Sequence, residues 1–187
     1  MKPIDIEPTQ GNLLVSEPFL RDYYFRRSVV LIADHDEEGS FGLILNKPID
    51  VKLNEIAKDF PDFDTNLYIG GPVKTDSLFV LHTLGNKIKN SSKIIQGLYW
   101  GGDIDIIKSM IEDNTITKDN IRFYIGYSGW DPKQLDRELE EHSWVVTKSK
   151  SDKFLFEQPE DMWKNLLKSM GNEYATWVNY PIDPTMN

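Results

Sequence analysis

A serine between two glycines, within the run GYSGW at residues 126–130, is the first candidate for chemistry in this sequence. A strand is predicted before the run and a helix after it, which is the setting of a nucleophilic serine, and His142 follows downstream. The nucleophile pattern G-x-S-x-G ends in glycine because its strained turn brings neighbouring backbone close. Trp130 occupies that last position, so we interpret Ser128 as part of a structural strand-to-helix turn and predict no catalytic residue.

Two glycines and a proline at residues 70–72 form either a ligand-contacting turn or a tight turn between two strands. A phosphate loop needs several consecutive backbone N–H groups and a helix N-terminus directly behind them. Pro72 removes one donor, and the segment that follows is predicted to be a strand. The tight turn is therefore the favoured interpretation, with ligand contact as its alternative.

Polar residues at other predicted strand ends could join this turn in one ligand-binding cleft. Arg26 and Arg27 precede a buried strand, where they could clamp an anion or, as we favour, pair with nearby carboxylates. If a cleft exists, the sequence predicts a small anion as its ligand. The predicted ligand-binding residues are Arg27, Asn46, Gly70, Gly71 and His82.

Metal and thiol chemistry have little support in this sequence. The chain has no cysteine, and none of its three histidines lies at a short ligand spacing from another. The acidic run at residues 34–38 (DHDEE) lacks the ligand order of a calcium-binding loop. We interpret it as the solvated tip of a hairpin, with weak binding of a hard cation as the alternative, and we predict no metal site and no cofactor.

The net charge limits the class of partner. With 30 acidic and 21 basic residues the chain carries −9, which opposes approach to phosphate backbones and anionic membranes. No apolar run approaches the about 18 residues of a spanning helix, and the first ten residues lack the apolar core of a signal peptide. We expect a cytoplasmic protein that neither associates with membranes nor binds nucleic acid directly.

The apolar periodicity predicts strands and helices that interleave without regular βαβ alternation, which favours a mixed sheet. We expect one domain over residues 1–187, in which residues 1–10 form a flexible lead and residues 171–187 form a tail packed on the domain. The predicted strands are 11–15, 28–33, 41–45, 67–69, 77–83, 94–100, 121–127 and 143–147, and the predicted helices are 53–60, 103–113, 132–142 and 159–170.

Several short runs also occur together in a distinctive order. They are GNLL at 11–14, YFRRSVV at 24–30, GLILNKP at 42–48, GGPV at 70–73, FVLH at 79–82, GLYW at 97–100, and GYSGW at 126–130 followed by QL at 134–135 and EL at 138–139. Together they resemble the bacterial AlgH/YqgE family over roughly residues 11–170. The family pattern tolerates alanine where this chain has Ser128, which weakens the nucleophile hypothesis further.

The resemblance implies an α+β fold: a single domain with a mixed, strongly bent, barrel-like β-sheet flanked by helices. It implies no reaction, cofactor or catalytic residue, and the family is often described as a transcriptional regulator. We therefore predict a non-enzymatic regulatory or interaction protein that acts through a protein partner. The alternative is a small-molecule or anion-binding protein, or an enzyme, with a cleft near the turn at residues 70–72.

Overall fold

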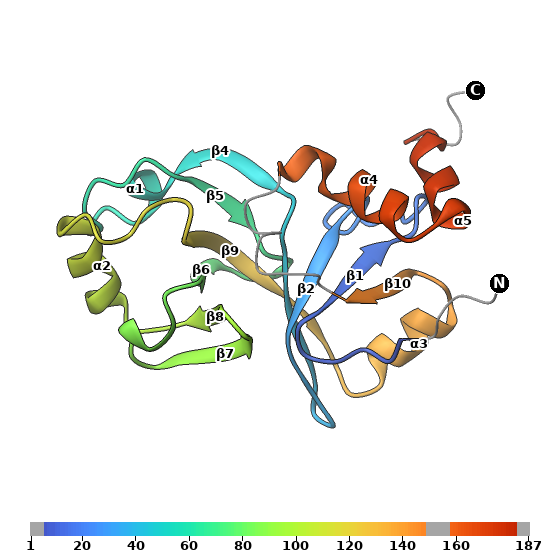
Figure 1. The fold of residues 1–187 in the computed structure, drawn as a ribbon, viewed down its shortest axis with the longest axis horizontal. Helices are drawn as coiled ribbons and strands as arrows, with labels where there is room; N and C mark the ends of the chain where they lie inside the picture. The colour runs from blue at the N-terminus through green and yellow to red at the C-terminus, as the bar shows by residue number, and fades with distance from the viewer. Residues whose placement is uncertain (1–5, 149–157, 183–187) are drawn as a thin grey trace.

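The structure, a computed structural model, describes residues 6–148 and 158–182 as a single α+β domain (Figure 1). The strands in these residues are β1 (Asn12–Ser16), β2 (Val29–Asp36), β3 (Gly39–Ile44), β4 (Pro48–Lys52), β5 (Asn66–Ile69), β6 (Val73–His82), β7 (Ser91–Ile95), β8 (Leu98–Gly101), β9 (Ile121–Trp130) and β10 (Trp144–Lys148). The helices are α1 (Leu53–Ile56), α2 (Ile104–Glu112), α3 (Gln134–Glu140), α4 (Pro159–Ser169) and α5 (Asn172–Ala175), with 3₁₀ turns at Gly85–Lys87 and Thr176–Asn179.

All ten described strands belong to one sheet, whose main path runs β10-β1-β2-β3-β9-β6-β8-β7. The pairs along this path are antiparallel, whereas β5, which also pairs with β4, joins β9 in parallel. The sheet is therefore mixed, as expected. The expected barrel-like form is not confirmed, because the path ends at β10 and β7 and no described pairing joins these two strands.

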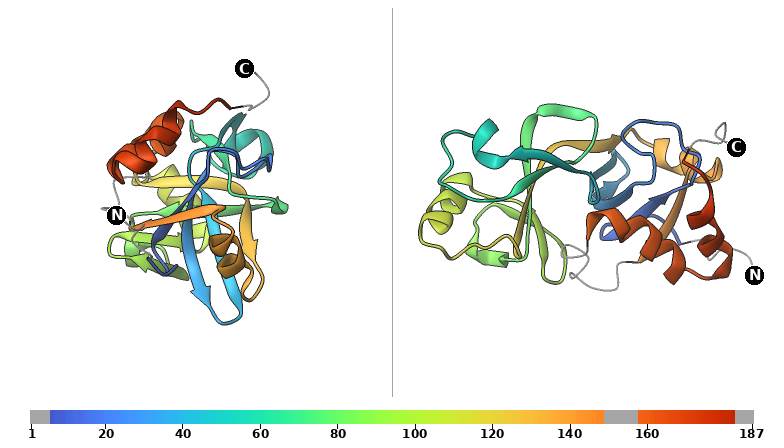
Figure 2. Two further views of the ribbon diagram at one scale, coloured as in Figure 1. Left: turned by 90° about the vertical axis from the view of Figure 1, so that its right-hand side faces the viewer. Right: turned by 90° about the horizontal axis from the view of Figure 1, so that it is seen from above.

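Strand β9 is the element that the two halves of the domain share (Figure 1). We call β1–β3, β10 and α3–α5 the first lobe, and β4–β8, α1 and α2 the second lobe. One end of β9 pairs with β3 in the first lobe, and the rest pairs with β5 and β6 in the second. Helices α3 and α4 cover opposite faces of the first-lobe strands, as Figure 2 shows end-on.

The glycines at positions 70 and 71 allow the chain to cross β9. Tyr124 of β9 pairs with Tyr68 of β5 and with Phe79 of β6, so these two strands lie at opposite edges of β9. The connecting residues 70–72 must pass over β9 to join them. A Cβ on Gly70 would lie 2.1 Å from the carbonyl oxygen of Gly126, which no side chain tolerates. The segment joins two strands, as predicted, but it is a crossing rather than a simple turn.

Gly126 is the third glycine of this crossing. Its φ is +67°, in the left-handed region that favours glycine, and a Cβ there would lie 2.5 Å from the carbonyl oxygen of Gly71. A Cβ on Gly71 would in turn lie 2.3 Å from the carbonyl carbon of Tyr127. The two backbones are therefore in direct contact where they cross, and the glycines are explained by packing.

Several elements differ from the predictions. Residues 94–100 are not one strand: they form the β7–β8 hairpin, which turns at Gly97 with φ +83°. Strand β4 was not predicted, because Pro48 was expected to end a strand; it instead begins one, where its missing N–H is tolerated. Helix α1 ends at Ile56 rather than at residue 60, and the Ile56 side chain is exposed.

Helices α2 and α4 form where the sequence predicts them, whereas α3 begins at Gln134 rather than at residue 132 and α5 lies in the predicted tail. Asp103 caps α2 by accepting hydrogen bonds from the N–H groups of Asp105 and Ile106. Helix α4 buries one face against the first-lobe strands through Met162, Trp163, Leu166 and Leu167. None of the described helices combines the length and the apolarity that crossing a membrane requires.

The chain after α4 lies against the first lobe as far as the structure describes it. Tyr174, Trp177 and Val178 pack against the same core cluster as α4. The ring of Tyr180 stacks on Phe19, with ring centroids 5.2 Å apart. The predicted lead and tail extend into residues 1–5 and 183–187, which lie outside the described residues, so the predicted boundaries stay predictions.

Candidate functional site

The structure brings Arg27 and Asn46 together at the entry to β2. The Asn46 amide donates to the Arg27 carbonyl at 3.0 Å and accepts from the Val29 N–H at 2.8 Å. Arg27 has φ +51°, so this side-chain clamp holds a backbone conformation that few residues adopt. Asn46 therefore stabilises the turn before β2, and its polar atoms are both committed.

The Arg27 side chain is held by neutral partners. Its guanidinium lies 4.9 Å from the ring centre of Trp163 and donates to the carbonyl oxygen of Tyr180. Within the described residues it forms no ion pair, so the favoured prediction of a carboxylate partner is not confirmed there. Burial and the neighbouring charge of Arg26 both lower the pKa of Arg27. The guanidinium thus links the turn before β2 to α4 and to the residues after it.

Gly70 and Gly71 lie at the crossing, beside Ser128. The Ser128 hydroxyl is fully buried and donates to the Gly70 carbonyl at 2.9 Å. Trp130 is also buried, and its indole N–H donates to Glu138 at 2.8 Å. Both side chains have structural roles, as predicted, but residues 126–130 are the last residues of β9 rather than a strand-to-helix turn.

His82 lies in the second lobe, fully buried. Its Nδ1 accepts from the Leu84 N–H at 3.2 Å, so the ring proton is on Nε2, which lies 2.9 Å from the Ser91 hydroxyl. That hydroxyl donates to the Ile88 carbonyl at 2.8 Å. Burial lowers the pKa of His82 from 6.5 to about 4, so the imidazole is neutral near pH 7. The histidine is a fully bonded part of the core.

The five predicted residues thus occupy three places: the entry to β2, the crossing, and the core of the second lobe. None of the five lines either of the two grooves described in this structure. Their role in binding a ligand stays a prediction. A different set of side chains forms the more promising site.

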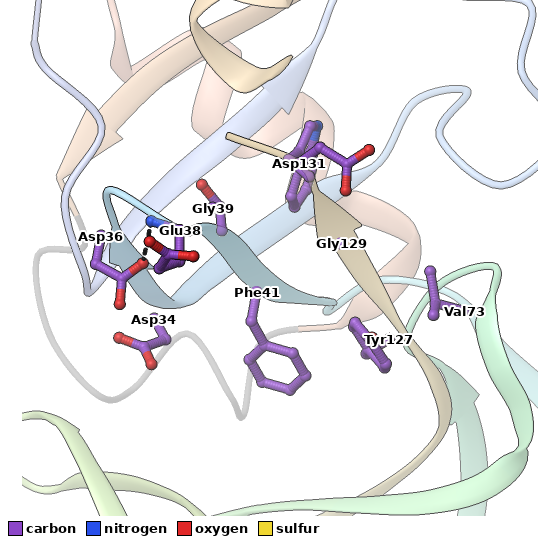
Figure 3. Close-up of a pocket in the computed structure, with 11 residues that line it drawn as sticks. Asp34, Asp36, Glu38, Gly39, Phe41, Val73, Tyr127, Gly129 and Asp131 are labelled. Carbon is purple, nitrogen blue, oxygen red and sulfur yellow. Dashed lines mark hydrogen bonds between the residues drawn. The ribbon is translucent and has the colours of Figure 1, made fainter. Parts of the chain in front are cut away.

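A groove of about 390 Å³ opens between the β2–β3 hairpin and the end of β9 (Figure 3). We call it the acidic–aromatic groove, because carboxylates and aromatic rings dominate its lining. The lining residues are Asp34, Asp36, Glu38, Gly39, Ser40, Phe41, Val73, Tyr127, Gly129, Trp130 and Asp131. Its volume is at the lower end of the range of small-ligand sites.

Strand pairing places the acidic and aromatic groups next to each other. Asp34 of β2 lies directly opposite Phe41 of β3, and both side chains border the open space in Figure 3. Strand β3 also pairs with the last residues of β9, which bring Asp131 to the other side of the groove. Gly39 allows the close approach of the hairpin to β9, since a Cβ there would lie 2.4 Å from the carbonyl oxygen of Trp130.

The aromatic part of the groove is firmly packed. The ring centre of Phe41 lies 4.6 Å from that of Trp100 and 4.9 Å from that of Tyr127. Phe79 contacts both Phe41 and Tyr127 from the second lobe. These rings come from four strands in both lobes, so the aromatic surface is continuous across β9. Such a surface can stack on a planar cation with little loss of conformational entropy.

The electrostatics of the groove favour a positively charged ligand. None of its four carboxylates forms an ion pair with another described residue, and no lysine or arginine is among the described residues that line it. From the described residues, Asp34 and Asp36 accept hydrogen bonds only from the backbone N–H groups of His35 and Glu38. No group of three metal-ligating side chains suited to an ion occurs in the described part of the chain. An organic cation such as a guanidinium or ammonium group fits this chemistry best.

The acidic run lies at a hairpin end, as predicted, but the aromatic surface beside it was not predicted. Residues 34–38 do form the end of a hairpin, yet three of their carboxylates line a groove with Phe41 and Tyr127. The available signal was the alternation of strand side chains, which puts Asp34 and Phe41 on one face once the hairpin register is known.

A separate cluster of buried polar atoms lies between β5 and β9. The hydroxyl of Tyr124, the Nη1 of Arg122 and the Oδ1 of Asn66 are all buried without a hydrogen-bond partner. Burial raises the pKa of Tyr124, and the nearby guanidinium of Arg122 offsets this in part. An unsatisfied buried hydroxyl is unfavourable, so the Tyr124 hydroxyl should reduce stability.

We expect Tyr124→Phe to raise the free energy of unfolding by about 1 kcal/mol, because it removes an unpaired hydroxyl while keeping the ring. Urea denaturation of both proteins measures this difference. The matched control is Tyr23→Phe, since the Tyr23 side chain is exposed and its hydroxyl is solvated. A destabilised Tyr124→Phe variant would show that the hydroxyl has a favourable partner.

Comparisons with known proteins agree on one family. A family model described as AlgH-like matches residues 13–175. A UPF0301 protein of Cytophaga hutchinsonii is 46% identical over 180 residues, covering 96% of this chain and 99% of that protein. A UPF0301 protein of Bacteroides fragilis is 45% identical over 184 residues, covering 98% and 93%.

Solved structures show the same fold. The solution structure of the AlgH protein from Pseudomonas aeruginosa has a TM-score of 0.74 at 25% identity, covering 97% of this chain and 98% of that one. A crystal structure of a Corynebacterium diphtheriae protein has a TM-score of 0.77 at 24% identity, covering 96% and 95%. The similarity to the Corynebacterium diphtheriae protein supports the fold alone.

Proposed function

The chain belongs to the AlgH-like family, and from this premise we propose that it is a non-enzymatic interaction protein that binds a cationic segment of a protein partner. The binding site is the acidic–aromatic groove. The regulatory role expected from the family resemblance is then exerted through that partner. Cationic segments are abundant in proteins that contact nucleic acid, so an acidic protein can act in regulation without touching DNA itself.

The observation that carries this proposal is the set of carboxylates around a packed aromatic surface, none of which has an ion-pair partner in the part of the chain that the structure describes. Asp34, Asp36 and Asp131 can each accept a charge-assisted hydrogen bond from arginine or lysine. Phe41 and Tyr127 supply the ring faces on which a guanidinium stacks, worth about 0.5–1 kcal/mol at exposed sites. Each contact is modest, so affinity requires several cations in one segment.

The state of the other polar residues supports binding rather than catalysis. Ser128 and His82, the residues with the most nucleophile-like and base-like chemistry, are buried and hydrogen-bonded to the protein itself. Neither borders the acidic–aromatic groove. The groove offers carboxylates and rings, which hold a cation without transforming it.

We expect the triple variant Asp34→Asn, Asp36→Asn, Asp131→Asn to bind a labelled peptide of alternating arginine and glycine at least about tenfold more weakly than the wild type. Fluorescence anisotropy at two salt concentrations measures this. The glycines disfavour a β-strand, so the peptide reports on charge and stacking. Wild-type affinity should fall as salt rises.

The control is the charge-matched variant Glu112→Gln, Asp113→Asn, Asp119→Asn, whose carboxylates are exposed in the second lobe. It should bind the peptide nearly as the wild type does. If both triple variants lose equal affinity, only the net charge matters and the groove is not the site. Equal binding of a glutamine–glycine peptide would also contradict the proposal.

A further inference from the structure

Strand β10 is an open edge of the sheet. In the described residues it pairs only with β1. The Ser143 carbonyl accepts a hydrogen bond from the Glu17 N–H at 3.0 Å. Because backbone groups alternate in direction along an antiparallel strand, the N–H and C=O groups of Val145 and Thr147 also point toward β1. The backbone N–H and C=O groups of Trp144 and Val146 therefore point away from the sheet, and no described residue pairs with them.

A second groove, of about 640 Å³, follows this open edge. Trp144 and Val146 face the α3 side of the sheet, where they pack with Leu139, whereas Val145 faces the side of α5. The groove reaches both sides of β10, with α3 forming one wall and Trp177 after α5 contributing to the other. An extended chain placed there would meet unpaired backbone groups and apolar surface together.

The charges at this groove select one class of occupant. Glu7, Glu140 and Glu173 line it, and all three are exposed. Among the described residues, no lysine or arginine lines this groove. A second copy of this chain paired through β10 would bring two such sets of glutamates together, which like-charge repulsion opposes. A segment that alternates apolar and basic residues matches both the apolar walls and the carboxylates.

We propose that the edge of β10 binds an extended segment of a partner protein as an added β-strand, with apolar residues in the groove and lysine or arginine at the three glutamates. Addition of a strand satisfies the backbone groups of Trp144 and Val146. This surface is distinct from the acidic–aromatic groove and shares no lining residue with it.

The test uses the whole chain and a peptide of alternating valine and lysine. Its control is the same peptide N-methylated on alternate residues, which keeps the charge but cannot form the ladder. We expect the unmodified peptide to slow amide hydrogen exchange at Trp144 and Val146 at least tenfold, with little change at Val145 and Thr147, which already bond β1. The methylated peptide should bind at least tenfold more weakly.

Two triple variants distinguish this proposal from binding at the acidic–aromatic groove. The triple variant Glu7→Gln, Glu140→Gln, Glu173→Gln should bind the valine–lysine peptide at least tenfold more weakly than the wild type. The triple variant Asp34→Asn, Asp36→Asn, Asp131→Asn should bind this peptide with wild-type affinity. Equal binding of the methylated peptide, or no protection at Trp144 and Val146, would overturn strand addition. A different result would identify a second copy of this chain as the occupant: a dimer in sedimentation, with slow exchange at Trp144 and Val146 in the absence of peptide. That result would also overturn the proposal.

Discussion

Gly70→Ala is expected to lower the free energy of unfolding by at least about 3 kcal/mol, the largest effect of any single substitution considered for this protein. The added Cβ would lie 2.1 Å from the carbonyl oxygen of Gly126. Backbone atoms cannot rotate aside as a side chain can, so the two crossing segments must separate. That movement would stretch the hydrogen bonds that the Gly70 carbonyl accepts from Ile44 and Ser128.

Thermal and urea denaturation measure this loss. The control is Gly171→Ala, because Gly171 has φ +112° but no atom within 4 Å of an added Cβ. It reports the cost of backbone strain alone, about 1–3 kcal/mol. If Gly70→Ala unfolds at the wild-type denaturant concentration, the backbones at the crossing are not in contact and this account of the glycines is wrong.

Acidification is expected to destabilise the protein through His82, by up to about 3 kcal/mol between pH 6.5 and pH 4. Burial lowers the folded-state pKa from 6.5 to about 4. Below pH 6.5 the unfolded chain binds a proton that the folded protein does not, so the free energy of unfolding falls. The stability contributed by the neutral imidazole is fully present above pH 6.5, and the decrease in the free energy of unfolding levels off below the folded-state pKa.

Comparing the pH dependence of unfolding in the wild type and in His82→Gln isolates this effect. Carboxylates titrate in both proteins, so the difference between the two curves reports the imidazole. We expect the variant to be less stable at pH 7 but to lose less stability on acidification. His142→Gln, at an exposed histidine, should retain the wild-type dependence. A wild-type pH dependence in His82→Gln would show that another group is responsible.

Sequence reasoning succeeded where local patterns determine the structure. Strand β2 and helices α2 and α4 follow from apolar runs and periodicity. The prediction failed at residues 94–100, where the apolar residues on either side of Gln96 and Gly97 were interpreted as one strand although the chain turns at Gly97. The left-handed φ of that one glycine, rather than the polarity of its neighbours, reverses the chain.

The candidate site was harder to predict because its parts are remote in sequence. The hydroxyl of Ser128 and the carbonyl of Gly70 are 58 residues apart in the chain, and only the pairing of β5 and β6 with β9 explains their contact. Likewise, Asp34 acquires an aromatic neighbour from β9 only when β3 pairs with that strand. The polar residues at predicted strand ends therefore indicated neither the contact of Ser128 with Gly70 nor the position of Asp34 beside an aromatic ring.

The sharing of β9 has a consequence for the biogenesis of this protein. Strands β3, β5 and β6 are all synthesised before β9, yet each uses it as a neighbour, and residues 70–72 can settle only across it. Neither lobe can complete its core until Trp130 has left the ribosome. The nascent polypeptide therefore keeps apolar surface uncovered through most of its translation, and chaperones would meet it during that interval.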